Sequence, residues 1–216
     1  MSIQVLLADD HEIMLEGLKQ LLRNTGDIDV IGVVKDGRTT VATALKCRPD
    51  ITIMDISMPS LNGIEATRKI TEELPDIKII ILSMHTGQEF ISEALRAGAH
   101  GYVLKECAFE ELTEAIYTVY NNKMYLSRDI TGTVVRDYVR KITSDNTPVA
   151  TQLTDREREV LQLIAEGNST KEIASILYVS GKTIDTYRRN LMKKLNMKSI
   201  AELTKYAIRA GFTSLE

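Results

Sequence analysis

The stretch Ile51-Thr-Ile-Met-Asp-Ile-Ser-Met-Pro-Ser-Leu-Asn-Gly63 decides how the first half of this chain folds. Its first four residues form a nearly continuous apolar run, and Asp55 follows directly. A second run of this kind, Ile79-Ile-Ile-Leu82, comes later in the chain. Strands that are covered on both faces, as in parallel sheets, have such apolar runs. We therefore predict that both runs are strands of a parallel sheet.

An alternation of strand and helix patterns extends over the first 121 residues. We predict five strands, at Gln4–Ala8, Ile28–Val34, Ile51–Met54, Ile79–Ser83 and Gly101–Leu104. Segments with helical spacing follow them, at Glu12–Asn24, Gly37–Lys46, Asn62–Glu73, Gln88–Ala97 and Phe109–Asn121. Five strand–helix units in a row predict an α/β domain over residues 1–121, with a doubly wound five-stranded parallel sheet.

The chain changes character after residue 121. Residues 122–150 are expected to form a linker, with room for a short helix near Arg128–Lys141 and a polar stretch at Thr143–Pro148. Residues 151–216 have the spacing of four helices, and Thr154 and Glu157 match a capping box at the start of the first. The second and third helices are joined by a short turn that contains Gly181. This pattern predicts an all-α four-helix helix-turn-helix domain.

Composition and length are those of an ordinary soluble globular protein with one or two domains. The chain has 216 residues and no run of 18 or more apolar residues, so we expect no membrane-spanning helix and no membrane partner. The N-terminus lacks the basic segment of a secretory signal. Two cysteines, Cys47 and Cys107, lack metal-ligand spacing. These features favour a cytoplasmic protein with free thiols.

The net charge of −3 is unevenly distributed along the chain. Residues 151–216 hold 11 Lys and Arg against 8 Asp and Glu, a net charge of +3, whereas the preceding 150 residues hold 16 against 22, a net charge of −6. The asymmetry favours an acidic regulatory part followed by a more basic part that contacts a partner.

Polar side chains follow four of the predicted strands. The first strand ends in Asp9 and Asp10, the third in Asp55, the fourth in Ser83 and the fifth in Lys105. Ligands of doubly wound sheets bind at this edge, where the strand order reverses, and in the common order 2-1-3-4-5 the first and third strands are neighbours there. A single aspartate after a strand is more often a helix cap. Four strand ends with suitable groups favour a shared pocket instead.

Three carboxylates that converge in one pocket repel one another, so a bound cation is expected. Ligands that are all oxygen atoms favour Mg²⁺. A carboxylate can attack phosphorus and form an aspartyl phosphate, which makes Asp55 the predicted phosphoacceptor. Lys105 would neutralise charge on the transferring phosphoryl group, and the Ser83 hydroxyl would donate a hydrogen bond to it. We expect His11 to lie beside this pocket without a chemical role.

Four stretches of the first 120 residues resemble the receiver domain of bacterial response regulators. They are Val5-Leu-Leu-Ala-Asp-Asp-His11, Ile53-Met-Asp-Ile-Ser-Met-Pro59 with Asn62-Gly63, Ser83, and Gly101-Tyr-Val-Leu-Lys105. The resemblance covers about residues 2–120 and implies a flavodoxin-like fold. It also implies that a sensor histidine kinase phosphorylates Asp55. Many receivers have a proline after the lysine, where this chain has Glu106.

The resemblance also implies roles for the residues around Asp55. Mg²⁺ would be bound by Asp10, Asp55 and the Ser57 carbonyl, with Asp9 helping through water. Ser83 and Tyr102 would form a switch pair, in which the hydroxyl turns to the phosphoryl group and the ring turns inward.

The predicted helix at about Lys182–Leu195 has two distinct faces. At about 100° per residue, Tyr187, Leu191 and Leu195 return close to Ile184 and should form a buried stripe. The opposite face carries Lys182, Thr186, Arg189 and Lys193. Arginine can pair with guanine edges, and threonine can contact a thymine methyl group or a phosphate. Such a basic face is common on solvated helices, but the preceding turn and the charge asymmetry favour DNA contact.

Residues Leu153–Phe212 resemble the LuxR-type DNA-binding domain. The matching stretches are Leu153-Thr-Asp-Arg-Glu-Arg-Glu-Val-Leu161, Ala165-Glu-Gly167, Lys171-Glu-Ile-Ala174, Lys182-Thr-Ile184 and Leu191-Met-Lys-Lys-Leu195. With the receiver, this is similar to the NarL/FixJ branch of response regulators. The resemblance implies binding to double-stranded DNA as a homodimer, through a fourth helix at about Ser199–Ala210. We predict DNA contacts by Lys182, Thr183, Thr186, Arg188, Arg189 and Lys193. Some members carry lysine where this chain has Asp185, so base preference does not transfer.

The predicted function is that of a DNA-binding transcription regulator controlled by phosphorylation of Asp55. An enzyme that turns over phosphorylated metabolites would need a second acid/base carboxylate two residues from Asp55, where this chain has Ser57. We therefore do not expect the protein to be an enzyme. The alternative is a regulator that binds DNA independently of phosphorylation and uses its receiver only for dimerisation. RNA binding is disfavoured, since the second domain offers no aromatic stacking surface.

Overall fold

The structure is a computed structural model that describes residues 2–132, 134–135 and 153–213. It divides into two compact units, Met1–Ser144 and Asp145–Glu216. Each unit has a hydrophobic core of its own. Among the helices of the described ranges, none is long and apolar enough to cross a membrane.

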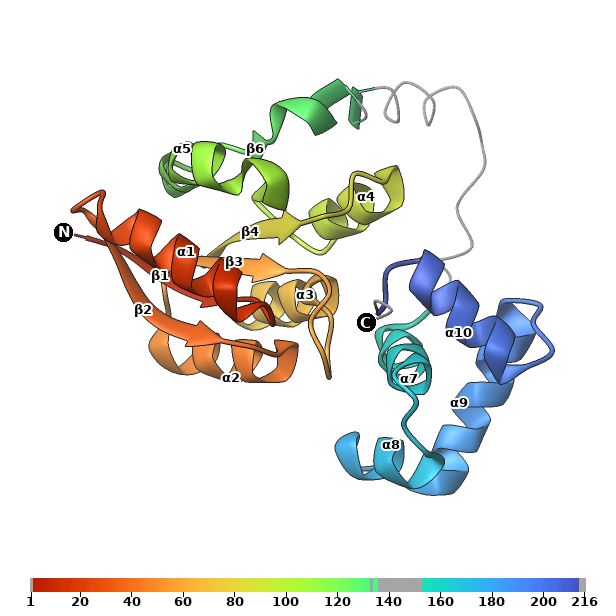
Figure 1. The fold of residues 1–216 in the computed structure, drawn as a ribbon. Helices are drawn as coiled ribbons and strands as arrows, with labels where there is room; N and C mark the ends of the chain where they lie inside the picture. Colours follow the sequence, from red (N-terminus) through yellow and green to blue (C-terminus); the bar gives the residue numbers. More distant parts are fainter. Residues whose placement is uncertain (1, 133, 136–152, 214–216) are drawn as a thin grey trace. The chain divides into compact units, whose positions relative to one another are not determined.

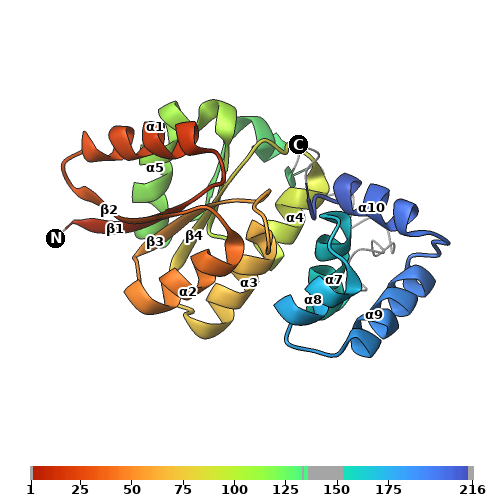
Figure 2. The same ribbon diagram turned by 60° about the horizontal axis from the view of Figure 1, so that its bottom comes forward.

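The first unit is a parallel sheet covered by helices on both faces (Figures 1 and 2). Its strands are β1 (Ile3–Ala8), β2 (Ile28–Val34), β3 (Ile51–Asp55), β4 (Lys78–Ser83), β5 (Gly101–Leu104) and β6 (Tyr125–Leu126). They lie in the order β2-β1-β3-β4-β5-β6, and every neighbouring pair is parallel. The α/β prediction and the order of the first five strands are therefore confirmed.

Helices cover this sheet in two layers. They are α1 (Glu12–Arg23), α2 (Gly37–Cys47), α3 (Gly63–Glu73), α4 (Gln88–Arg96) and α5 (Ala108–Tyr120), with a short 3-10 turn, η1 (Lys105–Cys107), before α5. Helices α1 and α5 pack on one face, and α2, α3 and α4 pack on the other (Figure 2). All five residues of β3 are buried. Burial on both faces explains the continuous apolar run that precedes Asp55.

Within the described residues the sheet has six strands, so the prediction of five was wrong by one. Strand β6 has two residues, which is too short for a periodic pattern, and it lies in the segment predicted as a linker. Residues 128–132 and 134–135 are helical, and Ile130 is buried in the same core cluster as Tyr102. The remainder of the helix expected near Arg128–Lys141 and the polar stretch Thr143–Pro148 lie outside the described residues.

In residues 153–213 the second unit consists of four helices, as predicted (Figure 1). They are α7 (Asp155–Ala165), α8 (Thr170–Ile176), α9 (Gly181–Lys194) and α10 (Ile200–Arg209). The capping box of Thr154 and Glu157 is present at the start of α7. Lys194 of α9 contacts the buried carboxylate of Glu157 at 2.7 Å, which ties the end of α9 to the start of α7.

Candidate functional site: an acidic pocket and a basic helix face

The acidic pocket lies where β1 and β3 end. The two strands are neighbours, with Ala8 opposite Met54, so Asp9, Asp10 and Asp55 follow at the same edge of the sheet. The chain turns back sharply after Asp55, and a Cβ on Gly63 would lie 2.0 Å from the Asp55 carbonyl oxygen. A glycine is therefore required for α3 to begin this close to the end of β3.

Lys105 links two of the carboxylates in the pocket. Its Nζ lies 2.8 Å from Asp9 Oδ2 and 3.0 Å from Asp55 Oδ2, and all three side chains are buried. Burial raises the pKa of Asp55 to about 6, Lys105 opposes this rise, and Asp9 and Asp10 add to it. The anionic form of Asp55 is therefore costly here unless positive charge is close to it.

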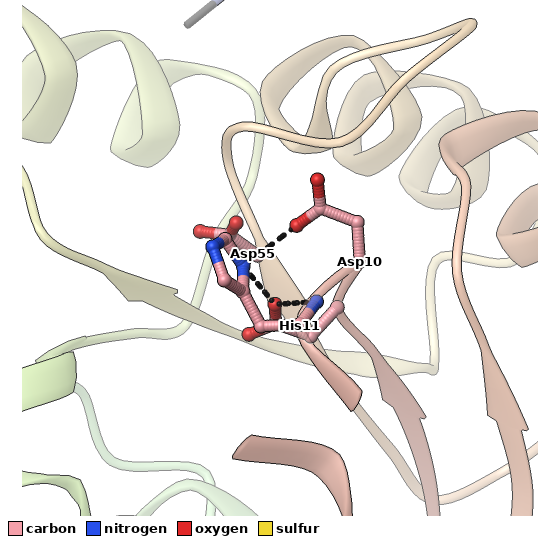
Figure 3. A group of neighbouring side chains, drawn as sticks. Asp10, His11 and Asp55 are labelled. Carbon is pink, nitrogen blue, oxygen red and sulfur yellow. Dashed lines mark hydrogen bonds and ion pairs between the residues drawn. The ribbon is translucent and has the colours of Figure 1, made fainter. Parts of the chain in front are cut away.

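His11 contacts the pocket more closely than the sequence suggested. Its Nδ1 lies 2.8 Å from Asp10 Oδ1 and 3.0 Å from Asp9 Oδ1, and its backbone N–H donates to Asp9 Oδ1 at 2.9 Å. Figure 3 shows Asp10, His11 and Asp55 gathered at the strand ends. The His11 side chain remains 66% exposed, which leaves it at the mouth of the pocket.

The donor set of the pocket suits a hard divalent cation. One ligand atom from each of Asp9, Asp10, His11 and Asp55 lies within 4.8 Å of the others. Among the described residues, Asp9 Oδ2, Asp10 Oδ1 and Asp55 Oδ2 are buried with no hydrogen-bond donor in good geometry, although the Lys105 ammonium lies near Asp9 and Asp55 and the His11 ring lies near Asp10. Burial of anionic carboxylate oxygens is costly unless a cation compensates their charge, and Mg²⁺ prefers such oxygen ligands.

Ser83, the first residue of the expected switch pair, ends β4, and Tyr102, the second, lies in β5. His85 connects the two through hydrogen bonds. Ser83 Oγ accepts the His85 N–H at 3.0 Å, and the Tyr102 hydroxyl donates to the His85 carbonyl oxygen at 2.7 Å. Both Ser83 and the Tyr102 ring are fully buried, and burial raises the pKa of Tyr102. The ring of Tyr102 therefore points inward in this structure.

His85 is a site residue that the sequence analysis missed. Its ring stacks on Phe90 of α4 at a centroid distance of 4.0 Å, and its Nε2 lies 3.2 Å from the Ser57 hydroxyl. Burial, followed by the charge of Lys105, lowers the pKa of His85. Its place two residues after Ser83, beyond the end of β4, is the signal that could have found it. The predicted role of the Ser57 carbonyl remains a prediction.

The second candidate surface is the exposed face of α9. Lys182, Thr186, Arg189 and Lys193 are all exposed, and Arg189 lies along the helix with its guanidinium 3.4 Å from the Thr186 hydroxyl. Ile184 and Leu191 are buried on the opposite side. Tyr187, expected in that buried stripe, is half-buried and lines a shallow hollow with Ser180, Lys182, Thr183 and Thr186.

Two predicted DNA contacts are engaged within the domain. The Thr183 hydroxyl lies 2.8 Å from Ser180 Oγ, which caps α9. The Arg188 guanidinium donates to the Thr170 hydroxyl at 3.0 Å and holds α9 against the first residue of α8. These two side chains therefore stabilise the helix-turn-helix itself, in addition to any contact with DNA.

Comparison with known proteins identifies both units. The family model for the response regulator receiver domain matches residues 5–117, and the model for bacterial regulatory proteins of the luxR family matches residues 151–207. The oxygen regulatory protein NreC of Staphylococcus carnosus (strain TM300) is 38% identical over 212 residues, which cover 96% of this chain and 97% of that protein. NreC of Staphylococcus aureus (strain JH9) is 36% identical over 211 residues, with the same coverage.

Solved structures that match nearly the whole chain agree with this result. A structure of the RcsB response regulator of Salmonella typhimurium matches with a TM-score of 0.66 and 28% identity, over 97% of this chain and 98% of that one. An RcsB–DNA complex matches with a TM-score of 0.61 and 29% identity, over 95% of this chain and 98% of that one. The chain therefore belongs to the NarL/FixJ type of response regulators, transcription regulators that join a receiver domain to a LuxR-family DNA-binding domain.

Proposed function

We propose that Asp55 accepts a phosphoryl group from a sensor histidine kinase and that this modification controls DNA binding through α9. The observation that carries the proposal is Lys105, whose buried ammonium lies 2.8 Å from Asp9 and 3.0 Å from Asp55. A lysine placed between two buried carboxylates can move from one anion to another. It is therefore suited to neutralise a phosphoryl group on Asp55.

The transfer requires one bond to form and one to break. An Asp55 carboxylate oxygen attacks phosphorus, the P–N bond of the kinase phosphohistidine breaks, and the electron pair stays on the histidine nitrogen. Lys105 neutralises charge on the phosphoryl oxygens, and the Ser83 hydroxyl donates a hydrogen bond to one of them. Mg²⁺, held by Asp10, Asp55 and the Ser57 carbonyl with Asp9 acting through water, would supply further positive charge when bound.

The DNA-binding part of the proposal rests on α9 and α10. Lys182, Thr186, Arg189 and Lys193 present cations and a hydroxyl on one exposed face, and Thr183 and Arg188 flank it. We assign base edges to the exposed face and phosphates to the flanks. The protein is proposed to act in the cytoplasm as a homodimer through α10. A solved structure of two RcsB dimers bound to two parallel DNAs supports the proposal of a dimer on DNA. The proposed domains are residues 1–121 and 151–216, joined by 122–150.

Stoichiometry separates this function from that of an enzyme. With Mg²⁺ and acetyl phosphate, the full chain should gain at most one phosphoryl group, read by intact-protein mass. Inorganic phosphate should then be released only at the slow rate at which the aspartyl phosphate hydrolyses. Removal of Mg²⁺ by EDTA should reduce uptake by about 100-fold or more, since the pocket would lose most of its positive charge. Sustained release of many phosphates per chain per minute would favour a phosphatase, and EDTA-resistant uptake would contradict the proposed metal site.

A further inference from the structure

Ser127, directly after β6, is buried, and its N–H and hydroxyl make three hydrogen bonds to β5 and α5. Its side chain is 0% exposed. Its backbone N–H donates to the Tyr102 carbonyl oxygen at 2.9 Å, and its Oγ accepts the Leu104 N–H at 3.1 Å. The same hydroxyl donates its proton to Glu111 of α5. Ser127 lies beyond residue 117, where the match to the receiver family ends.

These hydrogen bonds hold the end of β5 beyond the point where its pairing with β6 stops. Strand β6 pairs with Gly101 and Tyr102 of β5 and then ends, so the N–H of Leu104 has no β6 backbone carbonyl opposite it. The Ser127 hydroxyl takes the place of that carbonyl. A hydroxyl has one proton and two lone pairs, so it can serve Leu104 and Glu111 at once. The end of β5 is thereby connected to α5 through one side chain.

The held residues stand directly before the cation of the pocket. Leu104 precedes Lys105, and Tyr102 carries the buried ring whose hydroxyl reaches His85. The Lys105 ammonium lies 2.8 Å from Asp9 and 3.0 Å from Asp55, and a displacement of a reacting or charged group by about 1 Å can cost about 100-fold in rate. The alignment of the β5 end is therefore a requirement of the pocket as well as of the fold.

We propose that Ser127 is a positioning residue for the phosphoacceptor pocket, which acts by fixing the strand end that presents Lys105. The proposal rests on the proposed function of Asp55. If so, a residue on which the pocket depends belongs to the segment that connects the two units, because residues 128–152 follow Ser127 directly in the chain.

The test measures affinity for beryllofluoride in the presence of Mg²⁺, by ¹⁹F NMR titration of the full chain. Ser127→Ala removes the hydroxyl and is expected to weaken binding about tenfold. Thr40→Val is the matched control, since Thr40 is also buried and its hydroxyl donates to the carbonyl oxygen of Asp36, the N-cap of α2. This control should stay within about twofold of wild type, even if it loses comparable stability in urea unfolding. Ser127→Cys retains the size of the side chain with weaker hydrogen bonds and should lie between wild type and Ser127→Ala.

A double-mutant cycle with Lys105→Ala decides whether Ser127 acts through the lysine. Without Lys105, adding Ser127→Ala should weaken binding by less than about twofold. The inference is overturned if Ser127→Ala and Ser127→Cys both bind like wild type, or if the tenfold loss persists in the Lys105→Ala background. The proposed function fails separately, if wild type does not bind beryllofluoride or if Asp55→Asn binds it equally well.

Discussion

Asp55→Asn should reduce phosphoryl uptake from acetyl phosphate to below about 1% of the wild-type level, because an amide is not a nucleophile toward phosphorus. Asparagine has nearly the size of aspartate, so the buried side chain can keep its packing. Lys105 retains its contact with Asp9 in this variant, at 2.8 Å in the wild-type structure, so the pocket keeps one charge pair. Loss of uptake would then reflect chemistry rather than unfolding, which circular dichroism and thermal unfolding can verify.

The matched control for this variant is a carboxylate outside the pocket. Asp76 is exposed in the loop between α3 and β4, and Asp76→Asn makes the same chemical change there. Uptake by Asp76→Asn should equal that of wild type. Full, acid-labile uptake by Asp55→Asn would mean that another residue is the acceptor.

The second large effect concerns the exposed face of α9. Simultaneous replacement of Lys182 and Arg189 by alanine should weaken binding to a specific DNA site about 100-fold, from about 1–2 kcal/mol for each contact. Both side chains are exposed in the structure, so their removal should leave the core of the domain intact. Fluorescence anisotropy at fixed salt measures the affinity.

Arg209→Ala provides the control for the loss of positive charge. Arg209 is an exposed cation in the last turn of α10, on a different helix from the proposed reading face. Its removal should change the DNA affinity by less than about threefold. An equal loss for Arg209→Ala and for the double variant would show that net charge, and not the α9 face, determines binding.

Long, continuous patterns in the sequence predicted the architecture well. The runs that begin at Ile51 and Ile79 are continuous in apolar character because they are strands of a sheet covered on both faces. Because the strands are parallel, the polar residues at their carboxyl ends meet at one edge of the sheet. Strand β6 could not be predicted, because two residues carry no periodicity and its pairing with β5 depends on contacts distant in sequence. The role of Ser127 could not be predicted either, because its partners Leu104 and Glu111 are distant from it in sequence.

Side-chain partners within the site were harder to predict than the residues that form it. The helical wheel placed Arg188 beside the reading face but could not show that it donates to Thr170 on α8. It also placed Tyr187 in the buried stripe, where the structure leaves it half-buried beside Lys182. His85 follows β4 in an irregular loop, and its role becomes visible only when Ser57, Ser83 and Tyr102 are placed around it.

The affinity of the full chain for DNA, with and without beryllofluoride and Mg²⁺, most directly tests control of DNA binding by Asp55. The DNA would be a fragment selected from a random pool by the beryllofluoride-loaded protein. Beryllofluoride should tighten binding by wild type at least about tenfold, and it should leave binding by Asp55→Asn unchanged. An equal affinity of wild type in both conditions would contradict this control and would favour a regulator that binds DNA independently of phosphorylation.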